Sequence, residues 1–171
     1  SAIELNAVST LRFYPYWWTF SRMVKLDGEA HFEVIPGRKF AVVSEKGTTE
    51  VLGTSFNIYA RKDDYHVTCL TGKVRVTSPT RKTVILLPGS KAEVLENGEI
   101  SVQEKIDTYP AISWRNNIFL FTAKPVGEVF DEIERQYNIT IRSNLNEETR
   151  YSGNFTKEQN VEEILGYICP A

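Results

Sequence analysis

Short runs in which apolar and polar residues alternate fill most of the first hundred positions of the chain. Within residues 29–34, Ala30, Phe32 and Val34 fall on one face of an extended chain, because successive side chains of a strand point to opposite sides. The same period of two recurs in residues 22–26, 39–43, 55–61, 65–70, 73–77, 82–87 and 90–95. Turn residues separate these runs and no helical period is present, so the region predicts an all-β sandwich, barrel or β-roll.

The pattern changes after Ile106. Apolar residues recur at i, i+3, i+4 and i+7 between Val126 and Ile133, which is the spacing of an amphipathic helix. A second stripe of this kind follows Asn160, a residue suited to cap a helix. The expected elements are strands at residues 118–121, 139–141 and 151–155, a helix from Pro125 to Asn138, and a helix after Asn160. Together they predict a β-α-β-β-α order.

The chain is therefore predicted to be mainly β, in two parts joined by a linker. We expect an all-β domain over residues 1–106, a linker over residues 107–113 and a small α+β unit over residues 114–171. The second helix has no further strand after it to close the sheet. We therefore expect the small unit to be C-terminally incomplete.

Composition excludes several classes of protein. The chain is 42% hydrophobic and 25% charged, which suits a folded domain with a core. Its net charge is −2, with 20 basic and 22 acidic residues, whereas a nucleic-acid-binding domain needs a basic surface. No run of about 18 apolar residues offers a membrane span. The two cysteines, Cys69 and Cys169, have no metal-ligand spacing and indicate no disulfide framework.

The most plausible metal ligand in the sequence is His31, which lies between Glu29 and Glu33 on one face of a strand. This trio could chelate a divalent ion, and a metal-dependent enzyme of the cupin type is the corresponding alternative function. Such a barrel needs several histidines, and the chain has two. Alternation alone also explains the trio as a water-facing polar strand face. We predict no catalytic, cofactor-binding or metal-binding site, and no enzyme activity.

The segment 14–20 contains five aromatic residues, among them Trp17 and Trp18. Tyrosine and tryptophan combine an apolar ring with a polar group and are enriched at interfaces. The segment is therefore either a contact surface for a protein or glycan, or a loop whose rings fill one end of the core. A glycan-binding or small-ligand-binding β-sandwich that uses these tryptophans remains an alternative function.

A series of short motifs runs in order along nearly the whole chain. The most specific are the run 24–34, which contains Gly28, Glu29 and Ala30, and the run from Leu52 to Asn57. The others lie at residues 5–7, 11–13, 40–42, 72–76, 87–89, 114, 120–121, 125–126, 129–130, 133–139, 152–155 and 162–165. In this order they resemble the FecR family of transmembrane regulators, in the form common in the Bacteroidetes. His31 stands where the family more often has an aromatic residue, and the aromatic residues at 16–20 occupy a loop that is usually more polar.

The resemblance implies a signalling protein. Family members regulate an extracytoplasmic-function (ECF) sigma factor through a cytoplasmic part, which is followed by a single inner-membrane helix and a periplasmic region. The periplasmic region receives a signal from the signalling domain of an outer-membrane TonB-dependent transporter for siderophores or glycans. This chain resembles the periplasmic region. The cytoplasmic part and membrane helix are then expected before Ser1, and the small domain is expected to continue beyond Ala171.

We expect the small unit to dock on the transporter by strand addition, with the β domain as a spacer. The candidate contact residues are Arg135, Tyr137, Arg150 and Asn154. Arg135 offers a fork for a carboxylate, and Tyr137 offers an amphipathic anchor. Tyr137 also continues the apolar stripe of the first helix, so a place in the core is the competing interpretation.

Overall fold

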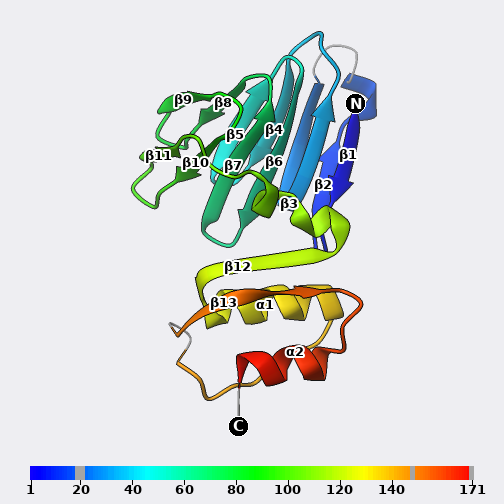
Figure 1. Cartoon of the computed structure of the whole chain (residues 1–171). Helices are drawn as coiled ribbons and strands as arrows, with labels where there is room; N and C mark the ends of the chain where they lie inside the picture. The colour runs from blue at the N-terminus through cyan, green and yellow to red at the C-terminus, as the bar shows by residue number, and fades with distance from the viewer. Residues whose placement is uncertain (18–21, 147–148, 170–171) are drawn as a thin grey trace. The chain divides into compact units, whose positions relative to one another are not determined.

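A computed structural model of the chain describes residues 1–17, 22–146 and 149–169. The chain divides into two compact units, Ser1–Ile112 and Ser113–Ala171 (Figure 1). The first unit is built from strands, and the second combines two strands with two α-helices. The mainly-β fold class predicted from the sequence is confirmed. No helix among the described residues is long and apolar enough to cross a membrane.

Two sheets that share strand β3 make up the first unit. Its strands are β1 (Ala2–Leu5), β2 (Thr10–Phe13), β3 (Arg22–Val34), β4 (Phe40–Ser44), β5 (Gly47–Val51), β6 (Thr54–Arg61), β7 (Asp64–Thr71), β8 (Val74–Thr77), β9 (Thr83–Leu86), β10 (Ser90–Val94) and β11 (Ile100–Gln103). The neighbours along the ladder are β11-β10-β7-β6-β3-β4-β5-β8-β9, and β1 and β2 both pair with β3. Two short 3-10 turns, η1 (Pro15–Trp17) and η2 (Tyr109–Ala111), also belong to this unit.

Strand β3 changes sheets halfway along its length. Its first half pairs antiparallel with β2 and parallel with β4, whereas its second half pairs with β1 and β6. A straight strand of this length would separate Arg22 from Val34 by about 40 Å. The connection 35–39 nevertheless brings the chain back to Phe40, which pairs with Arg22, and so short a segment reaches only about 20 Å. β3 must therefore bend.

The bend falls at Gly28, where the partner strand changes from β2 to β1. Gly28 has φ +115°, a backbone conformation that favours glycine. Ser9, in the loop between β1 and β2, fills the space beside it. A Cβ on Gly28 would lie 2.6 Å from Ser9 Cβ and 2.7 Å from Ser9 Cα. The sequence therefore places glycine where the chain turns and where a second segment packs against the turn.

The core of the first unit lies between the two sheets, and both contribute to it. Phe32 stacks on Phe56 with ring centroids 5.0 Å apart, and Phe40 of the other sheet lies 5.9 Å from Phe32. The apolar faces of the predicted alternating runs are buried, and Val51 of β5 joins them from outside those runs. The predicted members are Val24, Leu26, Ala30, Phe32, Val34, Phe40, Val42, Phe56, Ile58, Val67, Cys69, Val74, Val76, Leu86, Ala92 and Val94. The apolar inner faces of the two sheets thus pack against each other and form one core.

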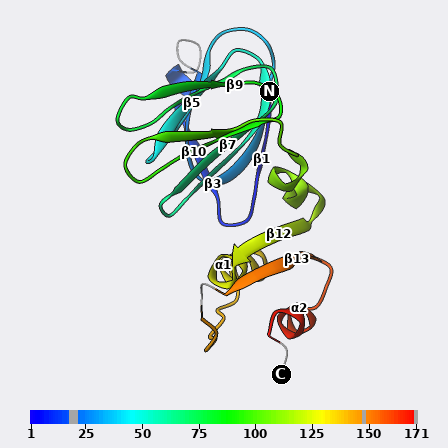
Figure 2. The ribbon, with the colours of Figure 1, turned by 60° about the vertical axis from the view of Figure 1, so that its left-hand side comes forward.

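The second unit has its own core. Its elements are η3 (Ser113–Asn116), β12 (Ile118–Pro125), α1 (Val126–Tyr137), β13 (Arg150–Thr156) and α2 (Val161–Ile168), and β12 pairs antiparallel with β13 (Figure 2). Helix α1 buries Val129 and Ile133 against Phe119 and Phe155, the residues that stack across the two strands at 4.8 Å. Asn160 caps α2, since its side-chain oxygen accepts a hydrogen bond from the Glu162 N–H.

The strand predicted at residues 139–141 does not form, so the described elements follow the order β-α-β-α. Asn138 ends α1 in the left-handed conformation, with φ 53° and ψ 49°. The backbone N–H groups of Asn138 and Ile139 both donate to the Glu134 carbonyl, and the N–H of Ile141 donates to the Glu134 carboxylate at 2.6 Å. The N–H groups of Ile139 and Ile141 are therefore bonded to the end of α1, and they are not available to pair with a neighbouring strand.

Replacement of Gly28 tests the bend in β3. We expect Gly28→Ala to lower the free energy of unfolding by about 1–3 kcal/mol more than Gly37→Ala does, because the added Cβ collides with Ser9 as well as straining the backbone. Gly37→Ala is the matched control, because Gly37 also has a positive φ (152°) but no atom lies within 4 Å of its Cβ position. Urea unfolding of both variants provides the comparison. Equal losses would show that the Ser9 contact contributes nothing.

The two cysteines offer a second test of the packing. Burial raises the pKa of Cys69 to about 11, and this side chain has no exposed surface, whereas Cys169 is partly exposed. At pH 8 the reactive thiolate of Cys69 is therefore scarce and inaccessible. We expect iodoacetamide to modify only Cys169 in the folded chain and both cysteines in urea, as read by mass spectrometry. Modification of Cys69 in the folded chain would contradict this packing.

Candidate functional site

The two-stranded sheet of the second unit leaves strand edges open. Among the described residues, β12 and β13 pair only with each other, so each has one outer edge without a partner strand. Such an edge presents backbone N–H and C=O groups that another chain can pair with. At the end of β13 the edge is already occupied, because the Thr156 N–H donates to the Gln159 side chain at 2.8 Å. The open part of β13 is therefore residues 150–155.

A bulge shapes this sheet. The register shifts between Phe121 and Lys124, and Ala123 has φ +48°. The Ala123 N–H donates to Ser152 Oγ at 2.8 Å, and Arg150 Nη1 donates to the Ala123 carbonyl at 3.1 Å. Two side chains of β13 thus hold the bulge of β12. Bulges of this kind redirect the side chains beside them.

The two candidate contact residues on β13 share one face of the strand. Arg150 and Asn154 are both exposed, and alternation places them on the side away from the buried Phe155. Asn154 lies opposite Leu120 of β12. Arg150 therefore has a structural task at the bulge and an exposed position at the open edge, and Asn154 is available to a partner along the same edge.

Tyr137 is partly buried and packs against the core of the second unit. Its ring is 6.4 Å from that of Phe155, and its hydroxyl donates to the carbonyls of Thr156 at 3.1 Å and Gln159 at 3.0 Å. Burial raises the pKa of the Tyr137 hydroxyl. The side chain ties the end of α1 to the turn between β13 and α2. Of the two interpretations given above, the geometry favours the place in the core.

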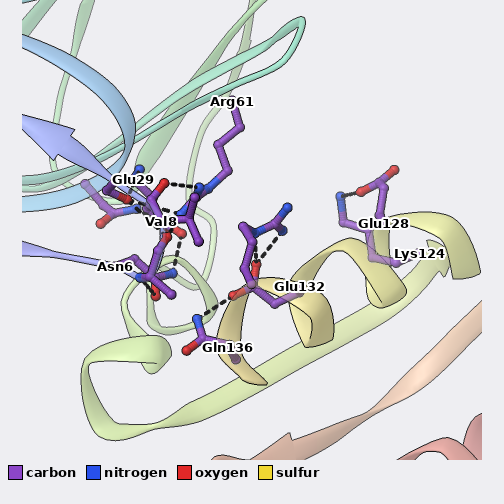
Figure 3. Close-up of polar contacts among 12 residues, drawn as sticks. Asn6, Val8, Glu29, Arg61, Lys124, Glu128, Glu132 and Gln136 are labelled. Carbon is purple, nitrogen blue, oxygen red and sulfur yellow. Dashed lines mark hydrogen bonds and ion pairs between the residues drawn. The ribbon is translucent and has the colours of Figure 1, made fainter. Parts of the chain in front are cut away.

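Arg135 interacts with its own helix. Its guanidinium donates twice to Glu132 Oε2, at 2.6 Å through Nη2 and at 3.2 Å through Nε. The Gln136 side chain donates to the other carboxylate oxygen of Glu132 at 2.8 Å, as Figure 3 shows. Both side chains of the Arg135–Glu132 pair are largely shielded, at 15% and 11% exposed. The fork that the sequence offers for a partner's carboxylate is therefore directed at a carboxylate of α1.

The described part of the aromatic segment, residues 14–17, lies at one end of the first unit (Figure 1). Tyr14 is 77% exposed and Tyr16 is 93% exposed, so the described rings do not fill the end of the core. Trp17 is the last residue of η1, and its side chain lies outside the described part of the chain, as does Trp18. A contact surface is therefore the better interpretation for the two tyrosines.

Glu29 and His31 on this strand face are buried and Glu33 is exposed, which corrects the expectation that the whole face lies in water. Glu29 is 7% exposed and His31 is 1% exposed. Glu29 accepts hydrogen bonds at 2.8 Å from Asn6 on one carboxylate oxygen and at 2.8 Å from Asn57 on the other. These three side chains, with the neighbouring Arg61, form a buried polar cluster beside the bend of β3.

Arg61 extends this cluster to the loop between β1 and β2. Its guanidinium donates to the carbonyls of Ala7 at 2.6 Å and Val8 at 2.9 Å, and to Ser9 Oγ at 3.2 Å (Figure 3). Ser9 Oγ also accepts from the Glu29 N–H at 3.0 Å. The cluster therefore fastens the loop over the bend, and its chemistry is structural.

The polar cluster does not resemble a metal centre. Within residues 1–17, 22–146 and 149–169, no three His, Cys, Asp or Glu side chains come together as metal ligands. His31 Nε2 lies 3.5 Å from Glu33 and 3.3 Å from Ser55 Oγ, while the Glu29 carboxylate is bonded to two amides. The amides of Asn6 and Asn57 and the guanidinium of Arg61 were missed by sequence reasoning. The motifs at residues 5–7 and 52–57 contain the two asparagines, but neither indicates that they meet at Glu29.

Comparison with known proteins gives matches over most of the chain. Residues 1–75 match the family described as FecR protein, and residues 118–171 match the family described as FecR, C-terminal. Two crystal structures of a putative anti-sigma factor from Parabacteroides distasonis ATCC 8503, at 1.65 and 2.50 Å, are similar to this chain. Each has 29% sequence identity and a TM-score of 0.85, over 97% of this chain and 80% of that one. No curated protein matches.

A substitution that keeps the shape of Glu29 tests the buried polar cluster. In Glu29→Gln one acceptor oxygen becomes a donor that faces an asparagine amide. We expect the free energy of unfolding to fall by about 1–3 kcal/mol, the cost of a buried polar group left unsatisfied. Glu33→Gln is the control, because Glu33 lies on the same strand face with 54% of its side chain exposed. An equal effect of both substitutions in urea unfolding would contradict this role of Glu29.

Proposed function

Because the chain belongs to the FecR family of anti-sigma regulators, we propose that it forms the periplasmic part of a sigma regulator that takes its signal from an outer-membrane TonB-dependent transporter. The family is a regulatory, non-enzymatic kind of protein whose members are anchored in a membrane. In this proposal the chain is the periplasmic part of a single-pass inner-membrane protein. A cytoplasmic part outside these residues binds an ECF sigma factor. The inducing nutrient is a siderophore or a glycan, and nucleic acid is not a partner.

The open edge of β13 is the single observation that supports a docking role. A two-stranded sheet is marginal by itself and gains hydrogen bonds when a further strand is added. The signalling domain of the transporter supplies that strand in our proposal. Backbone pairing along residues 150–155 would provide the affinity, and side chains on alternate positions would provide the specificity.

The side chains along this edge define the kind of strand that fits. Arg150 and Asn154 are four residues apart on one face, so each meets a different side chain of the added strand. A carboxylate opposite Arg150 and a polar group opposite Asn154 are the complementary partners. Residues 111–171 carry six basic and nine acidic residues, so positive charge elsewhere on the partner would favour the encounter.

The first unit acts as a spacer in this proposal. Its sheets share the bent strand β3, and the buried polar cluster fastens the loop between β1 and β2 over the bend. Both halves of β3 are thereby held in pairs with neighbouring strands. A rigid unit of this kind can hold the docking unit away from the anchor without itself binding the transporter.

Docking is tested by calorimetry between this chain and the transporter's signalling domain, together with hydrogen exchange. We expect every second amide within residues 150–155, the ones that face the open edge, to become protected in the complex, because a new ladder would bond these while the others already face β12. We expect Asn154→Lys to weaken binding about tenfold, which corresponds to about 1.4 kcal/mol, since a charged side chain on an edge opposes strand addition.

Ser101→Lys is the matched control, because it places the same charge on β11, an exposed edge strand of the first unit. It should leave the affinity unchanged. Absence of heat and of protection with both domains folded would exclude docking. Protection confined to another edge would keep a transporter complex but reject β13 as its site.

A further inference from the structure

We propose that the end of the first unit that carries Ser1 rests against the surface of the membrane that anchors the protein. The contact is made by a group of exposed apolar side chains, here called the entry tip: Phe13, Tyr14, Tyr16, Met23, Ile35 and Leu52. This inference rests on the proposed function together with the expectation, implied by the family resemblance, that the membrane anchor precedes Ser1. The partner is a lipid bilayer with anionic headgroups.

The bend of β3 gathers the entry tip at one end of the unit. Arg22 Nη2 donates to Ser1 Oγ at 3.0 Å, and Arg22 Nη1 donates to the Arg38 carbonyl at 3.1 Å. The Ile35 N–H also donates to Ser1 Oγ, at 3.3 Å. These bonds join the start of the chain to both ends of β3. Figures 1 and 2 show the N-terminus and η1 at this same end of the first unit.

The six apolar side chains of the entry tip are about half to almost fully exposed, so they contribute little to the core. Tyr16 is 93% exposed, Tyr14 is 77% exposed, and Ile35 and Leu52 are each 64% exposed. Phe13 and Met23 are about half exposed at the facing ends of β2 and β3. Single exposed apolar residues are ordinary, but several at one end of a domain mark an interaction site.

The charges at this end suit an anionic surface. Arg22, Arg38 and Lys39 lie at the starts of β3 and β4. The nearby carboxylates are those of Glu33, beside His31, and Glu50, which pairs with Lys39 at 2.6 Å and lies 3.6 Å from Arg75. Cations interspersed with aromatic rings suit a headgroup layer that is both apolar and anionic.

A membrane suits the chemistry of the entry tip better than a protein partner does. Tyrosine and tryptophan favour the boundary between lipid and water because one end of each side chain is apolar and the other is polar. An anchor before Ser1 holds this end of the unit close to the bilayer at all times, so even weak contacts would be populated. Contact there would orient the first unit and direct its other end away from the membrane.

The chain's three tryptophans provide the measurement. Trp17 and Trp18 follow Tyr16 in the sequence, and Trp114 belongs to the second unit, so Trp114→Phe isolates the signal of the first two. The chain is tethered through a histidine tag before Ser1 to phosphatidylethanolamine–phosphatidylglycerol vesicles that contain a nickel-chelating lipid and brominated acyl chains. Bromine quenches only tryptophans that reach the lipid boundary. We expect clear quenching, reduced about threefold or more by Tyr14→Ser/Tyr16→Ser as apolar contact is lost.

Tyr167→Ser is the matched control, since Tyr167 is 72% exposed in the second unit, and it should leave the quenching unchanged. Arg38→Gln should reduce quenching on anionic vesicles and have little effect on phosphatidylcholine vesicles.

Absence of quenching, or equal quenching in the double variant, would overturn the inference. Loss of transporter binding in the double variant, with quenching unchanged, would instead identify the entry tip as a protein-docking surface. The vesicles contain no transporter, so this result is independent of the docking test.

Discussion

The bend of β3 at Gly28 is the constraint on which the rest of the first unit depends. Parallel strands ordinarily need a connection of a dozen or more residues, and β3 and β4 are joined by residues 35–39. The short connection is feasible because the bend brings both ends of β3 to the same end of the unit. The same bend lets one strand belong to two sheets, so that the two apolar faces meet without a separate crossover.

The bend also requires the buried polar cluster. Where the strand turns, the regular ladder is interrupted, and the loop between β1 and β2 must be held by side chains. Arg61 bonds the carbonyls of Ala7 and Val8, and Glu29 bonds Asn6 from the adjoining position. Buried charged groups are stable only with such partners. The polar residues that looked like a metal site are thus explained by the geometry of the backbone beside them.

The sequence predicts the parts of this structure that follow from local periodicity. The buried faces of the strands and the stripe of α1 agree with the structure because alternation and helical spacing act over a few residues. The burial of Glu29 and His31 could not be predicted, because it depends on Asn6, Asn57 and Arg61, which are distant in the sequence. Alternation gives the face of a side chain but not what covers that face.

The candidate site in the second unit also combines features that local periodicity predicts with features that it does not predict. Tyr137 could be placed beside the core from the helical stripe, whereas the pairing of Arg135 depends on which carboxylate the guanidinium meets, that of Asp131 four residues before it or that of Glu132 three residues before it. The strand expected at residues 139–141 is absent because Asn138 turns the chain and Glu134 takes up its donors. A local signal for alternation was thus overridden by a helix end.

The absence of that strand leaves β12 and β13 as a two-stranded sheet among the described residues, and a sheet this small gains more from an added strand than a larger one would. The helix end that removes one expected strand therefore makes the open edge of β13 a better place for a partner to bind.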